Sequence, residues 1–321
     1  MPSLPILASL LPFCLTISVA GTAQGQNYPV KPIRIVTAEA GGGGDIFARS
    51  VAPDLTASLG QQVIVENRGG SAIVPARIVV QAPADGYTVL QYGNPLWLLP
   101  FMRSDVPYDP LRDFQPITFA VRSPLVLVVN AAVPVKSVKD LIALAKAKPQ
   151  GLNYASGPNG SSPHLSAELF KSMAGINLVQ VSYKGTATAL NEVIGSQVQM
   201  MFSVSAPVMP HVNTGRLRAL AVTSALQSSL LPGIPAMAAA LPGYEAVAII
   251  GLFAQTGTPA AIISLLHREL VRAMIKTEVK ERFASAGSEI LGGTPAELAA
   301  AVKADMARMG KLIKDVGIRA D

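Results

Sequence analysis

Residues 33–49 read IRIVTAEAGGGGDIFAR. The first part predicts a short β-strand, because Ile33, Ile35 and Val36 are apolar and β-branched. Four glycines follow, and Asp45 then opens an apolar-periodic run that predicts a helix. Glycine has no Cβ, so this turn can take positive φ and a ligand can approach its backbone closely. The N–H groups and partial positive charge of the helix start, which the Asp45 carboxylate can also cap, make the stretch a candidate anion site.

The glycine turn lacks the residues of two common phosphate-binding loops. A Walker loop requires GxxxxGK[ST], and neither Lys-Ser nor Lys-Thr follows these glycines. The dinucleotide fingerprint GxGxxG also fails, because Ile46 and Phe47 fill the place of the third glycine. A tight strand-to-helix turn that binds no ligand therefore remains an alternative.

Strands and helices alternate along the chain. Residues 62–65 and 87–90 predict strands, and a helical stretch over 73–80 lies between them. After a Pro- and Asp-rich connection at 105–116, a strand at 125–129 restarts the alternation. This pattern predicts βαβ units, a mainly parallel sheet and the α/β class. A length of 321 residues suggests about two domains.

Local signals place several helix starts. Ser137 is expected to cap a helix that ends near Ala147. Thr258 and Thr294 are each followed by proline, which predicts a cap with proline in the first helical position. The last helix carries a row of basic residues and is expected to be amphipathic and exposed.

Three loops resemble one another in composition and position. They span residues 40–45, 156–163 and 183–188, are rich in Gly, Ser or Thr, and each stands between a predicted strand and a predicted helix. In α/β sheets, ligands bind at the carboxyl ends of strands, where such loops gather. Because these loops come from both halves of the chain, we expect a ligand cleft between two domains.

Charge and cysteine content limit the possible partners. The formal net charge is +6, but it is spread along the chain without a long basic run or interleaved aromatic residues, so no nucleic-acid partner is expected. The single cysteine, Cys14, lies in an apolar leader at residues 1–23 that resembles a secretory signal peptide, although no Lys or Arg precedes it. The chain after the leader therefore has no disulfide, thiol nucleophile or Cys metal ligand. We expect an exported protein whose leader is cleaved between Gly21 and Tyr28.

Catalytic and metal-binding patterns are absent from the sequence. It contains no HExxH, no GxSxG and no metal-spaced cluster of His or Cys, so we expect no metal, no cofactor and no catalytic residue. His164 can contact a ligand or can be a solvent-exposed residue at a helix start. Lys184 can pair with an anion or can be an ordinary loop lysine. Ser203 follows a strand, where it can line a cleft or have no special role.

The chain resembles the Bug-type extracytoplasmic solute receptors of tripartite tricarboxylate transporters, over roughly residues 28–317. The resemblance is carried by several motifs in order: YPVKPIRIV, AGGGGDIFAR, VENRGG, ADGYTVL, VPYDPLRDFQPI, LNYASGPNGSSPHLSAELF, VSYKGTATAL, GRLRALAV and FAQTGTP. It implies a two-domain periplasmic binding-protein fold, type II-like, that closes on a small organic carboxylate without catalysis. Domain 1 is expected at 28–127 plus 252–321 and domain 2 at 128–251, with crossings near Leu127 and Gly251.

The resemblance also implies a location, partners and a ligand-binding set. The expected location is the periplasm, and the expected partners are an organic acid and the membrane subunits of a transporter, with a monomeric receptor. The set implied is Ala40, Gly41, Gly42, Asp45, Ser156, Ser161, His164, Lys184, Gly185 and Thr186, to which the strand-end position adds Ser203. The sequence departs from the family at Gln199 and Ser203, where an aspartate is common, so the ligand itself stays unnamed.

Two other functions fit the same fold. The first is an exported hydrolase or lyase, which the lack of a nucleophile–base motif disfavours. The second is an orphan receptor without a transporter, acting in carboxylate sensing. Turnover of a bound ligand would distinguish the enzyme from either receptor.

Overall fold

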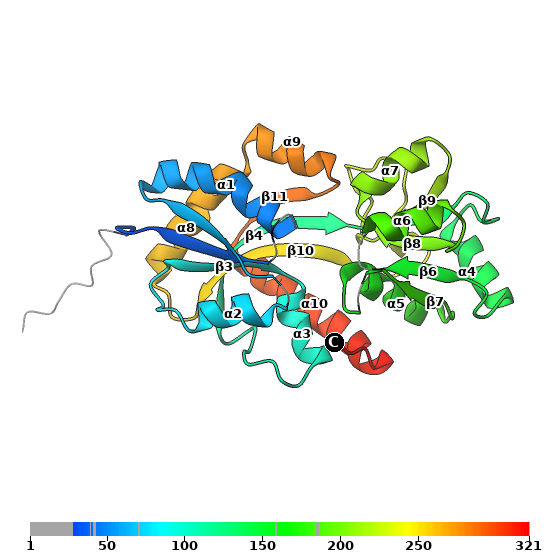
Figure 1. The fold of residues 1–321 in the computed structure, drawn as a ribbon, viewed down its shortest axis with the longest axis horizontal. Helices are drawn as coiled ribbons and strands as arrows, with labels where there is room; N and C mark the ends of the chain where they lie inside the picture. Colours follow the sequence, from blue (N-terminus) through cyan, green and yellow to red (C-terminus); the bar gives the residue numbers. More distant parts are fainter. Residues whose placement is uncertain are drawn as a thin grey trace, which may run out of the picture.

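The computed structural model describes residues 28–38, 40, 43–69, 71–157, 159–183 and 186–320, so the predicted leader lies outside the described residues. The chain forms two lobes, each built on one β-sheet with helices on both faces (Figure 1). The first sheet has the order β11-β4-β10-β3-β1-β2, with β1 at Ile33–Thr37, β2 at Val63–Asn67, β3 at Thr88–Gly93, β4 at Phe114–Pro124, β10 at Val247–Gln255 and β11 at Glu289–Gly293. Its helices are α1 (Gly43–Leu59), α2 (Ile73–Val80), α3 (Pro95–Met102), α8 (Ala260–Met274), α9 (Thr277–Ser285) and α10 (Pro295–Val316).

The second sheet has the order β7-β6-β8-β5-β9. Its strands are β5 (Val126–Asn130), β6 (Asn153–Ser156), β7 (Val179–Ser182), β8 (Met200–Ser203) and β9 (Leu217–Val222). Its helices are α4 (Val138–Ala147), α5 (Ser162–Ala174), α6 (Thr186–Ile194) and α7 (Ser205–Asn213), and a short 3₁₀ helix lies at Met237–Ala239. None of the described helices combines the length and the apolar composition that a membrane span requires.

Alternation along the strands explains why both faces of each sheet are covered. In β1, Ile35 packs into one core with Phe47 of α1, whereas its neighbour Val36 packs into another core with Trp97 of α3. Successive side chains of a strand point to opposite faces, so an uninterrupted apolar strand requires a helical layer on each side. The α/β class predicted from the sequence is confirmed.

The prediction of mainly parallel sheets is wrong, because both sheets are mixed. Among the described strands, parallel pairing joins β1 to β2 and β3, and β6 to β7 and β8. In the first sheet, β10 lies between β3 and β4 and runs antiparallel to both. A strand supplied by a distant part of the chain needs no crossover helix, so its direction is not fixed by the local βαβ pattern. The predicted connection at 105–116 also ends inside a strand, since β4 begins at Phe114.

The predicted helix caps have mixed outcomes. The Ser137 side chain accepts a hydrogen bond from the backbone N–H of Asp140, and Thr294 and Glu297 form a reciprocal capping box, as expected. Thr258 does not cap α8. Its hydroxyl donates instead to the carbonyl of Gln255, and Pro259 occupies the cap position.

The chain changes sheets twice. It passes from β4 to β5 between Pro124 and Val126, and it returns to the first sheet at Val247, where β10 begins. The crossings expected near Leu127 and Gly251 are therefore inside β5 and β10, a few residues after the changes of sheet. We propose that the two domains follow the two sheets.

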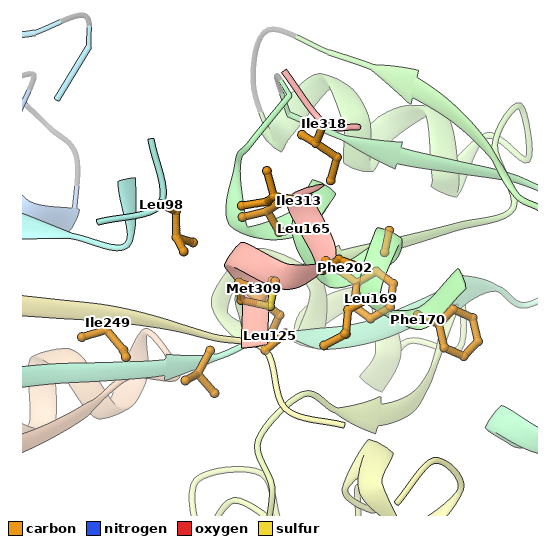
Figure 2. Packing of buried hydrophobic residues seen from close by; sticks show 14 of the residues in the cluster. Leu98, Leu125, Leu165, Leu169, Phe170, Phe202, Ile249, Met309, Ile313 and Ile318 are labelled. Carbon is orange, nitrogen blue, oxygen red and sulfur yellow. The ribbon is translucent and has the colours of Figure 1, made fainter. Parts of the chain in front are cut away.

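Helix α10 packs against both lobes, which corrects the expectation of an exposed last helix. Met309 and Ile313 lie beside Leu165 and Leu169 of α5 (Figure 2), and the same core includes Trp97 of α3. Asp305, also on α10, is buried and accepts hydrogen bonds from Asn94 Nδ2 and Trp97 Nε1, both at 2.8 Å. Desolvation raises the pKa of Asp305, although these bonds oppose the shift.

Candidate functional site

A cavity of about 490 Å³ lies at the carboxyl ends of β1 and β3. We call it the large cavity. Its wall includes Thr37 of β1, Gln91 of β3, Gly44 in the first turn of α1 and Ile250 of β10. Asn159 extends to the same cavity from the loop before α5, so both lobes contribute to its wall.

A second cavity, of about 260 Å³, lies at the strand ends of the other lobe. We call it the small cavity. Its wall includes Ser156 of β6, Ser203 of β8, Ser162 of α5 and Ala248 of β10. Residues two apart on a strand share a face and are separated by roughly 6–7 Å, so Ala248 and Ile250 place the two cavities side by side on one face of β10. Described residues of two of the three predicted loops, 40–45 and 156–163, line these cavities, whereas no described residue of 183–188 does.

Register in the first sheet brings two polar side chains together at the floor of the large cavity. Val36 of β1 is paired with Leu90 of β3, so the next residues, Thr37 and Gln91, stand side by side. Both are buried, and the Thr37 hydroxyl donates a hydrogen bond to Gln91 Oε1. A Cβ on Gly44 would lie 2.6 Å from that oxygen, so any larger residue at position 44 would displace the Gln91 side chain.

His164 holds the loop that precedes α5. Its Nδ1 accepts a hydrogen bond from the backbone N–H of Gly160 at 3.1 Å, which requires the proton of the neutral ring to be on Nε2. The residue is only 4% exposed, and burial lowers the pKa of His164 despite the opposing effect of Glu168. It therefore positions the loop that carries Asn159 and is not the solvent-exposed residue considered from the sequence.

The hydroxyls around α5 and β8 differ in their partners. Ser156 Oγ accepts from Gln180 Nε2 at 3.0 Å and donates to the Gly157 carbonyl. Ser161 is the cap residue of α5, but its side chain caps no N–H group. Ser161 Oγ and Ser203 Oγ are buried and have no hydrogen-bond partner among the described residues. Such unsatisfied hydroxyls are available to bind polar groups of a ligand.

Asp45 lies behind the loop of the first turn. Helix α1 begins at Gly43, so Asp45 is inside the first turn and not at the cap position. Its Oδ1 accepts from Arg49 Nε at 2.8 Å and from Asn67 Nδ2 at 2.9 Å. The side chain lies outside the described walls of both cavities, where it stabilises the turn.

The remaining expected residues have separate outcomes. Gly41, Gly42, Lys184 and Gly185 lie outside the described residues. Thr186 begins α6, and Ala40 is exposed and outside both cavity walls.

Sequence reasoning missed Thr37, Gln91 and Arg103. Arg103 follows α3 and lines the large cavity; its guanidinium pairs with Asp105, Nη2 to Oδ2 at 2.7 Å, and that hydrogen bond raises the pKa of Arg103. The missed signal for Thr37 and Gln91 was a polar residue at the carboxyl end of an apolar strand. Within the described part of the chain, no cluster of His, Cys, Asp and Glu could hold a metal ion.

Comparisons with known proteins relate the chain to one family of receptors. Residues 47–318 match the family described as TctC, tripartite tricarboxylate transporter family receptor. The UPF0065 protein in the tcbD-tcbE intergenic region of Pseudomonas sp. is 34% identical over 311 residues, which cover 96% of this chain and 93% of the relative. BugT of Bordetella pertussis is 32% identical over 319 residues and covers 98% of each chain.

Solved structures agree with this relationship. An R. palustris protein solved with adipate has a TM-score of 0.76 and 32% identity, covering 91% of this chain and 99% of its own. MatC from Rhodopseudomonas palustris, solved with bound malate, has a TM-score of 0.73 and 25% identity, covering 89% of this chain and 100% of its own. The periplasmic binding protein BugD has a TM-score of 0.73 and 29% identity, covering 92% and 100%. The two-sheet α/β fold, the strand-end cavities and these matches lead to one conclusion: the chain belongs to the TctC family of tripartite tricarboxylate transporter receptors.

Proposed function

We propose that this chain is an exported receptor that captures a small organic carboxylate between its two lobes and delivers it to a membrane transporter of the tripartite tricarboxylate type. One observation carries the proposal: first-turn residues of helices from both lobes, Gly44 of α1 and Ser162 of α5, line adjoining cavities on one face of β10. Helix N-termini present N–H donors and a partial positive charge, which suits an anion.

The cavity walls favour a small acid. None of the described lining residues of either cavity is Asp or Glu, and Arg103 adds a positive group to the large cavity. The cavities have about 490 and 260 Å³, which is the scale of sites for small molecules. Adipate and malate, which two of the similar proteins bind, are therefore suitable first candidates.

The binding residues follow from the cavity walls and the resemblance. We assign Ser156, Ser161 and Ser203 as hydroxyls that contact the ligand and His164 as the residue that positions the loop before α5. Gly41, Gly42, Lys184, Gly185 and Thr186 remain assignments from the family resemblance. Because both lobes contribute to one cleft, a bound acid favours the closed arrangement.

Location and partners are inferred from family membership. Receptors of this family bind solute outside the cytoplasm, so we infer a periplasmic, monomeric protein that meets its transporter subunits there. The rival functions are an exported hydrolase or lyase, and an orphan receptor for carboxylate sensing. His164 Nδ1 is occupied by the Gly160 N–H, which makes it a poor general base at that atom.

A ligand panel tests the proposal. Purified protein is titrated calorimetrically with succinate, malate, adipate and benzoate, and with the uncharged amides of the same acids. At least one acid should bind with a dissociation constant near or below about 1 µM and raise the melting temperature, whereas its amide should not. Absence of binding by every acid would contradict the receptor. Chromatography of the incubated mixture should recover the acid unchanged, and its conversion would identify an enzyme.

A further inference from the structure

Gln91 is a polar residue in the middle of an otherwise apolar part of the first sheet. It is 1% exposed, yet it lines the large cavity together with Thr37. A buried amide requires hydrogen-bond partners, because an unsatisfied polar group is costly in a low-dielectric interior. Gln91 Oε1 has such a partner, the Thr37 hydroxyl. No group in the described residues accepts a hydrogen bond from Gln91 Nε2.

The position of α1 favours the Gln91 amide oxygen on the side of the first helical turn. A Cβ built on Gly44 would lie 2.6 Å from Gln91 Oε1 and 3.1 Å from Nε2, so the oxygen lies nearer to the first turn of the helix. The partial positive charge of a helix N-terminus favours an oxygen on that side. The Thr37 hydroxyl donates to the same oxygen. Nε2 has no acceptor among the described residues, and the side chain that carries it lines the large cavity, so a ligand there is the candidate acceptor.

We propose that Gln91 Nε2 donates a hydrogen bond directly to the carboxylate of the bound acid, and that Thr37 is the positioning residue that orients this amide. The inference rests on the proposed function and names a residue that selects the ionised acid. A neutral amide donor suits this place, because it recognises an anion without burying a second charge. Its orientation is set before the ligand arrives, which lowers the entropic cost of binding.

The decisive substitution is Gln91→Glu, which keeps the shape and replaces the donor with an anionic acceptor. At about pH 8 the new carboxylate repels the ligand, so affinity for the tightest-binding acid of the panel should fall at least about 100-fold. Binding can then occur only when the new side chain takes up a proton. Calorimetry in buffers of different ionisation enthalpy should therefore report about one proton taken up by Gln91→Glu, and almost none by the wild type.

Other titratable groups near the cavity do not account for a difference in proton uptake between the variants. The titratable side chains among the described lining residues of the large cavity are Tyr92 and Arg103, and both are present in the wild type and in every variant, so a difference in proton uptake between them reports the new carboxyl group. Asp45, in the first turn of α1, is held by Arg49 and Asn67 in every variant.

Two variants separate direct contact from damage to the fold. Gln255→Glu is the matched control, because Gln255 lies in the same sheet, donates from Nε2 to the Val80 carbonyl at 2.9 Å and is outside the cavity wall. It should lower the melting temperature without changing affinity or proton uptake. Thr37→Val should weaken binding about threefold to tenfold without adding proton uptake, since the amide loses its orientation but not its donor.

The outcomes distinguish this inference from the proposed function. If the wild type binds no acid of the panel, the proposed function fails. If the wild type binds an acid and Gln91→Glu binds it equally well without taking up a proton, the role of Gln91 is wrong and the receptor stands. A folded Gln91→Glu that binds weakly at every pH without proton uptake also refutes direct contact.

Discussion

Substitution of Gly44 tests how closely α1 packs against Thr37 and Gln91 at the floor of the large cavity. Gly44→Ala adds a Cβ that would lie 2.6 Å from Gln91 Oε1 and 2.9 Å from Thr37 Oγ1, both closer than real Cβ contacts allow. The neighbouring glycine is a matched control, because a Cβ on Gly43 meets nothing within 4 Å. Neither glycine has a positive φ, so backbone strain does not separate the two substitutions.

The expected effect of Gly44→Ala has two opposing parts. Alanine gains up to about 1 kcal/mol over glycine in a helix, and Gly43→Ala should show that gain or no change. At residue 44, the buried hydrogen bond between Thr37 and Gln91 must break, and leaving buried polar groups unsatisfied costs about 1–3 kcal/mol. The net result should be a loss of roughly 1–2 kcal/mol in the free energy of unfolding.

Ligand affinity should also change, because the alanine Cβ displaces the Gln91 side chain. The end of the Gln91 side chain has to move to relieve the contact, and it lines the large cavity, so Gly44→Ala should weaken binding of the acid about tenfold, or about 1.4 kcal/mol. Urea unfolding measures the stability of both variants, and calorimetry measures their affinity. The reasoning is refuted if Gly44→Ala matches Gly43→Ala in both stability and affinity.

Three further predictions concern other parts of the fold. Burial lowers the pKa of His164 below its usual 6.5, so its contribution to stability should be complete above about pH 6.5 and should be lost as pH falls through the folded-state pKa. Urea unfolding of His164→Asn should show a smaller loss of stability than the wild type over that range. Asp305→Ala leaves the buried Trp97 N–H without an acceptor, while Asn94 Nδ2 keeps only its bond to the Val247 carbonyl, so the change should cost roughly 1–3 kcal/mol of unfolding free energy. Asp315→Ala, at an exposed position of the same helix, should change it by less than about 0.5 kcal/mol. Gly287→Val places its Cβ 1.7 Å from a side-chain oxygen of α7 in the other lobe, so small-angle scattering should show a larger radius of gyration than for the wild type. Gly292→Val, with a similar positive φ but no contact across the lobes, should leave that radius unchanged.

The elements with strong local signals could be predicted from the sequence. Strand β1 and helix α1 are marked by β-branched residues, a glycine turn and a helical period, and the structure has them at Ile33–Thr37 and Gly43–Leu59. The capping box at Thr294 is equally local. Helix α3 could not be found in this way. It contains two prolines and is apolar on all sides, so no helical period identifies it, and Asn94 in its cap position makes no side-chain capping bond.

Strand pairing between distant segments could not be predicted from local sequence patterns. The antiparallel course of β10 between β3 and β4 depends on residues more than a hundred positions apart. The floor of the large cavity also depends on distant pairing. Thr37 and Gln91 come together only when β1 and β3 pair in their observed register. A polar residue at the end of each apolar strand is a local signal, but the pairing of the two residues is not. The loops at the cleft were easier to predict because their composition alone marks them.

The position of β10 also determines the order in which the protein can assemble. All strands of the second sheet come from one continuous segment, so that sheet has its full set of strands once residue 222 has been made. The first sheet cannot, because β3 and β4 both require β10 as the partner between them, and β10 ends at Gln255. Until then each has an unpaired edge, which is the feature most prone to wrong association in a nascent chain. Strand β10 also supplies Ala248 to the cavity that holds Ser203 and Ile250 to the cavity that Gln91 lines, so a nascent chain acquires a complete binding site only after β10 has joined the first strands.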